Sequence, residues 1–285
     1  MERRVAFCIG FSVLTVLSML LCSCGIRFTW CRYTMDGHRT SVTPVGTENA
    51  DAALGRVENG VYTAPNGSVF NSGSTPLVAA DMIAVQPIMA SLRRVVAYAP
   101  ERMEAHRPES ELSNFIVDNL MAGVQKSTGR TIDVGVLNFG GIRADISEGN
   151  VLSGDIESML PFKNYPVYVQ LKGNDLQLLF EYMAETGMQI IGGAQVVIRG
   201  NKLESLTIGG EPVDPERLYG VATIDFLTDG GDGLHIAEKA IVTERMDCTL
   251  CELILPCIER LTVAGKPFCY HTDGRVVVIK DNDKP

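Results

Sequence analysis

The sequence predicts a mixed α/β fold in which helices and strands alternate along a single compact domain. Some segments carry apolar residues at helical spacing. In others, apolar and polar residues alternate or apolar residues follow one another without a break, as is typical of strands, and the two kinds of segment are interleaved. With 46% apolar and 21% charged residues, the 285-residue chain can bury a sizeable core. These observations exclude a disordered or purely helical chain.

The N-terminus has the features of an export signal. Arg3 and Arg4 precede eighteen mostly apolar residues, 5–22. The run ends at Leu21-Cys22-Ser23-Cys24, which resembles the cleavage and lipidation box of bacterial lipoproteins. We therefore expect residues 1–23 to be a removed signal peptide and Cys24 to carry the lipid, so that the chain is exported and anchored in the bacterial cell envelope. The alternative is an uncleaved anchor, because eighteen residues is near the lower limit for a spanning helix.

Residues 24–75 are rich in Gly, Thr, Asn and Ser and predict a spacer with short strands. The compact domain is expected at 76–285. It begins with a helical pattern, followed by a strand over residues 95–98. The apolar positions of that helical pattern are Met82, Val85, Ile88, Met89 and Leu92.

The middle of the chain predicts a helix and two strands. Ser110 precedes a helical pattern and is expected to cap it, because its hydroxyl can accept from the first free backbone amides. The apolar run 132–139 ends at two glycines and predicts a buried strand followed by a tight turn. Apolar and polar residues then alternate over 167–172, which predicts a half-buried strand.

Four further elements follow. Asn174 is expected to cap a helix with apolar residues at 176, 179, 180 and 183. A hairpin is predicted over 196–208 with its turn at 199–202, and a strand over 218–226 ends in glycines. A helical apolar stripe, with Cys257 among its members, runs over residues 250–261.

The charge of the chain argues against nucleic-acid polymers as partners. Acidic residues number 34 and basic residues 25, for a formal net charge of -9. A protein with no global positive field cannot attract a polyanion over a distance.

Asn138-Phe139-Gly140-Gly141-Ile142-Arg143 follows directly on a predicted strand. Strand ends of α/β sheets commonly form binding crevices, and the glycines would permit close approach of a ligand. Arg143 offers a planar fork that suits a phosphate or carboxylate. Taken alone, the motif is also explained as an ordinary tight turn.

Two further segments place an aromatic residue in a loop. Phe162 follows Pro161, and Phe226 stands at a strand end before an Asp232 set among glycines. Separately, these features suggest a hydrophobic plug and a glycine turn. Together they suggest more, because two aromatic rings can sandwich a planar base at about 1–3 kcal/mol per stacked base. Asp232 could bind ribose hydroxyls, and Asn138 and Arg143 could make polar contacts. Together with the two rings, these groups suit a nucleoside or nucleotide.

The histidines and cysteines predict no metal site. His106, His235 and His271 suggest loop or surface residues, and Asp36-Gly37-His38 a solvated turn. The spacing of four cysteines could suggest zinc, but their helical apolar surround favours core packing. A disulfide among them is plausible outside the cytoplasm, and the sequence does not choose the partners. The four are Cys248, Cys251, Cys257 and Cys269.

In order and spacing, five motifs resemble the C-terminal domain of 5'-nucleotidases over residues 95–280, roughly two thirds of the chain. The motifs are Asn138-x-Gly-Gly-Ile-Arg143, Leu160-Pro161-Phe162, Val169-Gln170-Leu171-Lys172-Gly173, residues 226–233 and Asp273-Gly274-Arg275. The resemblance implies that Phe162 and Phe226 stack on the base and that Asn138 contacts the nucleoside. It further implies that Arg143 holds the ribose and phosphate side and that Asp232 binds ribose.

The chain departs from this family at two points. The family has an arginine just before the Glu-x-x-x-x-Asn stretch, here Glu109 to Asn114, but Pro108 occupies that position and Arg107 lies one residue away. Catalysis in the family belongs to an N-terminal metallophosphoesterase domain with two divalent metals, whose second and third motifs are missing here. No catalytic or metal residue is therefore expected on this chain, and the metals are expected on a separate phosphoesterase chain.

Three functions remain open from the sequence. The first is the nucleotide-recognition half of a split 5'-nucleotidase, active in nucleotide catabolism with a metallophosphoesterase partner. The second is a non-catalytic, nucleoside-binding surface lipoprotein. The third is a surface interaction domain that kept the fold and lost the site.

Overall fold

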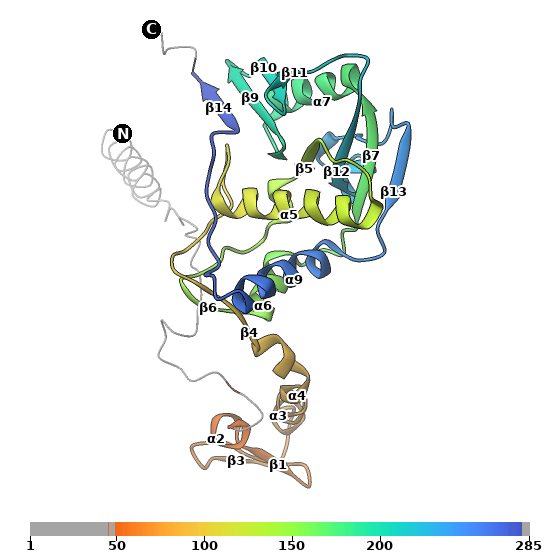
Figure 1. Cartoon of the computed structure of the whole chain (residues 1–285). Helices are drawn as coiled ribbons and strands as arrows, with labels where there is room; N and C mark the ends of the chain where they lie inside the picture. The colour runs from red at the N-terminus through yellow and green to blue at the C-terminus, as the bar shows by residue number, and fades with distance from the viewer. Residues whose placement is uncertain (1–44, 46–48, 281–285) are drawn as a thin grey trace, which may run out of the picture. The chain divides into compact units, whose positions relative to one another are not determined.

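The computed structural model describes residue 45 and residues 49–280 (Figure 1). The expected signal peptide, its lipidation residue Cys24 and the Asp36-Gly37-His38 motif lie outside the described residues. The described residues belong to one compact unit.

A mixed five-stranded sheet forms the centre of the fold and positions the candidate site. In spatial order its strands are β13 (Val242–Arg245), β7 (Pro166–Lys172), β12 (Leu218–Ile224), β5 (Val134–Leu137) and β8 (Ile190–Gly192). β12 and β5 run parallel, whereas β7 and β8 run antiparallel to their neighbours. The expected strands over 132–139, 167–172 and 218–226 are thus confirmed as neighbours in one sheet.

The other strands of the described region form three smaller sheets. A four-stranded sheet contains the predicted hairpin, whose strands pair antiparallel through a turn at 200–201. Its order is β11 (Glu211–Pro212), β10 (Lys202–Ile208), β9 (Ala194–Arg199) and β14 (Val276–Ile279). The other two are the pair β4 (Val95–Ala99) with β6 (Gly149–Leu152), and the N-terminal sheet β1 (Arg56–Glu58), β2 (Val61–Thr63) and β3 (Val69–Phe70).

Helices cover the central sheet. The longest, α5 (Glu111–Thr128), contacts β5, β7, β8 and β12 and packs on α9 (Leu250–Val263), as Figure 1 shows. Ser110 caps α5 as predicted, since its side chain accepts from the Ser113 amide at 3.2 Å. The remaining helical elements after residue 100 are η2 (Phe139–Gly141), α6 (Ser153–Met159), α7 (Gly173–Thr186), α8 (Asp225–Thr228) and η3 (Gly231–Gly233).

One local expectation is wrong, and a second holds with one exception. Asn174 does not cap α7, which begins at Gly173 without a side-chain cap. The amides of Gly173 and Asn174 instead donate to the Arg217 and Pro215 carbonyls at 2.9 and 3.0 Å, so a neighbouring loop satisfies them. The half-buried strand is confirmed for most of β7, since Gln170 is half-buried and Lys172 is exposed while the apolar positions are buried. Tyr168 departs from this alternation, because it is buried with the Arg130 guanidinium 5.1 Å from the centre of its ring.

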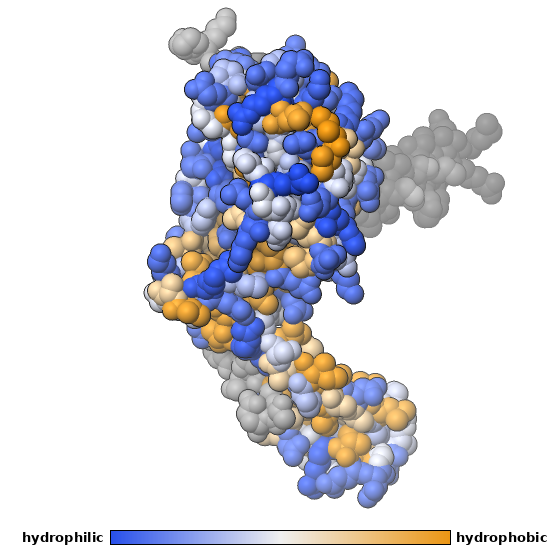
Figure 2. Space-filling view, turned by 45° about the vertical axis from the view of Figure 1, so that its right-hand side comes forward, coloured by the Kyte–Doolittle hydropathy of each residue, from blue (hydrophilic) through white to orange (hydrophobic). Residues whose placement is uncertain are grey.

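The N-terminal part contains the expected short strands and the expected helical segment. A small helix, α2 (Ala50–Leu54), precedes the three-stranded sheet. The predicted helical segment is formed by α3 (Thr75–Ala84), α4 (Gln86–Met89) and the 3-10 turn η1 (Ala90–Arg93). Its large apolar side chains are mostly exposed, and apolar colour gathers on these elements in the lower part of Figure 2.

The cysteines of the described region are free thiols. Cys251 and Cys257 pack against the hydrophobic core, which agrees with core packing. Burial raises the pKa of the Cys251 thiol, so this cysteine is a poor nucleophile.

Candidate functional site

The sheet topology brings four distant chain segments to one edge. Because β5 and β12 are parallel, the residues that follow them, 138–143 and 225–233, emerge side by side. β7 pairs Pro166 with Ile224, so the preceding loop 160–165 reaches the same edge. β8 pairs Ile190 with Leu137, which brings Met188 and Gln189 there too.

Asn138 is the buried polar group of this edge, with 6% of its surface exposed. Its Nδ2 donates to Oδ2 of Asp232 at 2.9 Å. Since a carboxylate only accepts, this contact fixes the orientation of the amide and turns Oδ1 the other way. Oδ1 is buried and has no hydrogen-bond partner among the described residues. A ligand N–H or O–H would satisfy it.

Gly141 makes room for the side chain of Asn138. A Cβ at Gly141 would lie 2.9 Å from the Asn138 Oδ1, and one at Gly140 would lie 3.4 Å from its Nδ2. Gly141 therefore allows the carboxamide to fold over the turn, whereas the distance at Gly140 is that of an ordinary van der Waals contact. Close approach of a ligand to these glycines stays a prediction.

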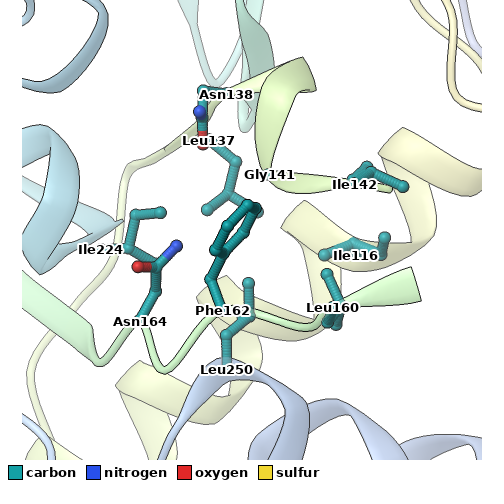
Figure 3. A pocket seen from close by; sticks show the side chains of 10 residues that line it. All are labelled: Ile116, Leu137, Asn138, Gly141, Ile142, Leu160, Phe162, Asn164, Ile224 and Leu250. Atoms are coloured by element: carbon teal, nitrogen blue, oxygen red, sulfur yellow. The ribbon is translucent and has the colours of Figure 1, made fainter. Parts of the chain in front are cut away.

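Phe162 lies at an apolar hollow beside Asn138 (Figure 3). In the figure its ring is directed toward the Leu137 and Gly141 side of the hollow, while Asn164 contributes a second carboxamide. The ring nevertheless remains 48% exposed, so one part of it packs as a plug and the rest stays open to a ligand. The apolar lining consists of Ile116, Leu137, Ile142, Leu160, Ile224 and Leu250.

Phe226 stands in the first turn of α8 and is 42% exposed. Its ring packs on Gly231, where any Cβ would collide with the ring. Gly231 thus leaves room for the ring. Asp232 is the next residue in the chain, so it follows the position on which the ring packs. Asp232 has a left-handed backbone with φ of 53°, a conformation that aspartate tolerates better than most residues.

Asp225 ties the two phenylalanine loops together. Its Oδ1 accepts from the backbone amides of Tyr165 at 3.0 Å and Phe226 at 2.9 Å. Its own amide donates to the Tyr165 carbonyl at 3.0 Å. The loop of Phe162 is therefore held to the element that carries Phe226. Sequence reasoning missed this residue, although an aspartate just before an aromatic at a strand end was its visible signal.

The two candidate arginines reach this edge differently. Arg143 leaves the Gly141 turn, with its amide bound to the Met159 carbonyl and its Nη1 3.4 Å from the Gly140 carbonyl oxygen. Arg107 lies with its guanidinium 4.8 Å from the centre of the Phe139 ring and donates from Nε to the Met188 carbonyl at 2.9 Å. Arg107 thus contacts the turn next to Asn138 from the β8 side.

Gln189 connects these parts and was not found from the sequence. It is buried, and its Oε1 accepts from the Phe139 amide at 3.2 Å and from Nη2 of Arg107 at 3.4 Å. Only the pairing of β8 with β5 brings it to the Asn138 turn. A glutamine beside an apolar run carries no such signal by itself.

A buried ion-pair network holds the neighbouring C-terminal segment. Arg275 is buried and donates to both carboxylate oxygens of Asp118, at 2.8 and 3.0 Å, to Asp273 at 2.8 Å and to the Ile191 carbonyl at 3.1 Å. The hydrogen bond from Arg275 lowers the pKa of Asp273. Burial, followed by its hydrogen bond to Asp118, raises the pKa of Tyr270 to about 12. These contacts join β14 to α5 and to β8.

Within the part of the chain that the structure describes, no group of three or more His, Cys, Asp or Glu side chains could hold a metal ion. The candidate site offers aromatic, polar and charged groups to a ligand. It presents two half-exposed aromatic rings, a carboxamide, a carboxylate and two guanidinium groups.

Comparison with known proteins gives a matching family model and several relatives. The model described as "5'-nucleotidase, C-terminal domain" matches residues 90–239. Protein UshA of Escherichia coli K12 is 35% identical over 109 residues, which is 35% of this chain and 19% of that protein. The human 5'-nucleotidase is 27% identical over 160 residues, 47% of this chain and 28% of that protein.

A solved structure shares the fold. The 5'-nucleotidase precursor from Thermus thermophilus superposes with a TM-score of 0.62 at 23% identity, over 79% of this chain and 46% of that one. The chain thus spans about a fifth to a quarter of the first curated relatives and about half of this solved structure.

Proposed function

The chain belongs to the 5'-nucleotidase family through its C-terminal domain, and from this premise we propose that it recognises a nucleoside or nucleotide for a separate metallophosphoesterase chain. The observation that carries the proposal is the meeting of Asn138, Asp232, Phe162 and Phe226 at one edge of the central sheet. These residues come from three loops that are far apart in sequence. Each loop brings a group that a nucleoside can use.

The base would lie between the rings of Phe162 and Phe226. Both rings are about half exposed and their loops are held together through Asp225. Stacking of a base on aromatic side chains contributes about 1–3 kcal/mol per base. The buried Oδ1 of Asn138 would accept a hydrogen bond from the ligand, which removes the cost of an unpaired buried acceptor.

The sugar and phosphate would lie toward the charged groups. Asp232 keeps one carboxylate oxygen for ribose hydroxyls while the other binds Asn138. Arg143 and Arg107 would supply guanidinium groups on the phosphate side. Divalent metals on the partner chain would supply the activation of water for phosphate hydrolysis. This chain would hold the nucleotide so that its phosphate is correctly placed for the partner.

We further propose that the chain is exported and anchored in the bacterial cell envelope through a lipid at Cys24. The basic start, apolar segment and cysteine box at residues 3–24 support this.

Calorimetry with adenosine and AMP tests the recognition site. We expect Phe162→Ala and Phe226→Ala each to weaken binding about 5- to 150-fold, which corresponds to the loss of about 1–3 kcal/mol of stacking. The matched control is Tyr98→Ala, an exposed aromatic on β4 whose replacement should leave affinity unchanged. Absence of binding of either ligand at millimolar concentration would contradict nucleoside recognition and favour a surface interaction domain.

Phosphate release from AMP tests the partner. The protein should release little phosphate alone, and addition of an exported metallophosphoesterase that lacks its own recognition domain should increase the rate. If adenosine binds but mixing gives no gain, the chain is a non-catalytic nucleoside-binding lipoprotein.

A further inference from the structure

The helical segment 75–89 has an apolar face that other described residues cover only in part, where Val78 and Met82 share a hollow with Leu54 and Tyr62. Exposure of the six large apolar side chains on it ranges from 38% at Met89 to 73% at Ile88. Apolar patches of this kind on a soluble protein mark an interaction surface. The other four residues are Leu77, Val78, Met82 and Val85.

This segment is fixed in the fold although its face is open. α3 contacts α2, β1 and β2 at one end, and η1 contacts α6 at the other. Only Pro76, Ala79 and Gln86 are buried along it, and the core cluster begins at Val96. By length and composition alone, residues 75–93 are apolar enough to cross a membrane. Because both ends fold onto neighbouring elements, the segment is better placed to lie along a surface.

The face carries little charge. Between residues 75 and 92 the single ionisable side chain is Asp81. Arg93 and Arg94 follow at the end, where Arg93 binds Gln86 and Arg94 pairs with Glu259 at 2.6 Å. A partner that matched this face would therefore be apolar, and complementary charge would contribute little.

The number of residues between Cys24 and α2 limits how far this face can lie from a lipid at Cys24. Residues 25–48, which separate Cys24 from the first described helix region, number 24 and span at most about 85 Å when fully extended. α2 follows this stretch at once and contacts α3. A lipid at Cys24 would thus keep the face within reach of the bilayer at all times, which raises its effective concentration there.

We propose that the face formed by Leu77, Val78, Met82, Val85, Ile88 and Met89 inserts into the surface of the lipid bilayer as a second membrane contact. The inference rests on the lipid anchor proposed for Cys24 and is independent of nucleoside recognition. Helices that lie on a membrane bury their apolar face roughly 5–10 Å into the boundary between headgroups and acyl chains. The contact would depend on apolar area and little on anionic lipid.

Tryptophan fluorescence in vesicles tests this on the full lipidated protein. Trp30 is the single tryptophan of the chain, so Ile88→Trp in a Trp30→Phe background reports on the face alone. The protein is reconstituted in vesicles of phosphatidylethanolamine and phosphatidylglycerol, with or without phosphatidylcholine brominated on its acyl chains. Leu178→Trp in the same background is the matched control, since Leu178 is an apolar, 46% exposed residue on helix α7.

We expect brominated lipid to quench Ile88→Trp at least about twofold and to leave Leu178→Trp nearly unchanged. Equal quenching of the two variants, or failure of the protein to associate with vesicles, would overturn the proposal. Protection of Ile88→Trp from acrylamide without quenching by brominated lipid would overturn it as well, and would show that a second copy or another protein covers the face. Adenosine titration of the same vesicles reports separately on the recognition site.

Discussion

Gln189 holds the turn that presents Asn138. Its one carboxamide oxygen accepts from the Phe139 amide and from Arg107, and it does so from a buried position at the start of β8. A buried amide without an acceptor costs about 1–3 kcal/mol. The geometry of the candidate site therefore depends on a residue that need not touch the ligand.

Replacement of Gln189 by methionine should loosen this turn. We expect Gln189→Met to lower the free energy of unfolding by about 1–2 kcal/mol and adenosine affinity by roughly 5-fold, because the Phe139 amide loses its acceptor. Gln189→Glu keeps an acceptor and a partner for Arg107, so it should bind more tightly than Gln189→Met. Calorimetry and urea unfolding of the two variants check this, and equal affinities would contradict a positioning role.

Among single residues, the sequence predicts those whose type and position next to a strand already indicate a chemical role. Asn138, Phe162, Phe226 and Asp232 each adjoin a recognisable strand, and the structure brings them to one edge. Gln189 could not be predicted, because it acts on a backbone amide of another loop, and the partner amide of Asp225 in the Phe162 loop could not be predicted either. Which amides those are depends on strand pairing between distant segments. The resemblance of the motifs to a family supplied their roles, which remain proposals.

Among the elements, β14 depends on the ion pairs of Arg275 with Asp118 and Asp273 for its place beside β9. Tyr270 adds a hydrogen bond to Asp118 at 2.9 Å. The pKa of Tyr270 is raised from 10.0 to about 12. A group whose pKa is higher in the folded protein stabilises the fold fully below its unfolded pKa and loses that contribution as pH rises toward the folded value.

The stability that Tyr270 provides should therefore disappear in alkali. We expect the native protein to be more stable than Tyr270→Phe at pH 8, with a difference that shrinks between about pH 10 and pH 12. Urea unfolding of both proteins over this range measures the difference. A gap that stays constant to pH 11.5 would show that the hydroxyl does not couple to folding.

The elements with a clear period or cap could be predicted, and those set by long-range contacts could not. The helix after Ser110 and the hairpin at 194–208 follow from local pattern alone. The start of α7 differs because carbonyls of the 214–217 loop replace a side-chain cap. The helical segment 75–93 was found from its spacing, but spacing does not say whether a partner covers the apolar face.

For the molecule as a whole, ligand binding should raise thermal stability by mass action. At an adenosine concentration of about 100 times Kd, the stabilisation is about 2.7 kcal/mol. For a folded body of this size that corresponds to a rise in Tm of roughly 5–11 °C. Differential scanning fluorimetry checks this, and the rise should be much smaller for Phe226→Ala at the same adenosine concentration. No shift for the native protein at millimolar adenosine would contradict nucleoside binding.

The parallel pairing of β5 with β12 has a consequence for how such a domain can diversify. The backbone ladder and the core beneath it belong to the strands, whereas the groups that would touch a ligand belong to the loops 138–143, 160–165 and 225–233. Substitution of the exposed residues of these loops would thus leave the framework intact, provided that core residues such as Leu160 and Leu227 stay apolar. Descendants of the same scaffold could then present different contacts to a ligand through the exposed residues of these loops.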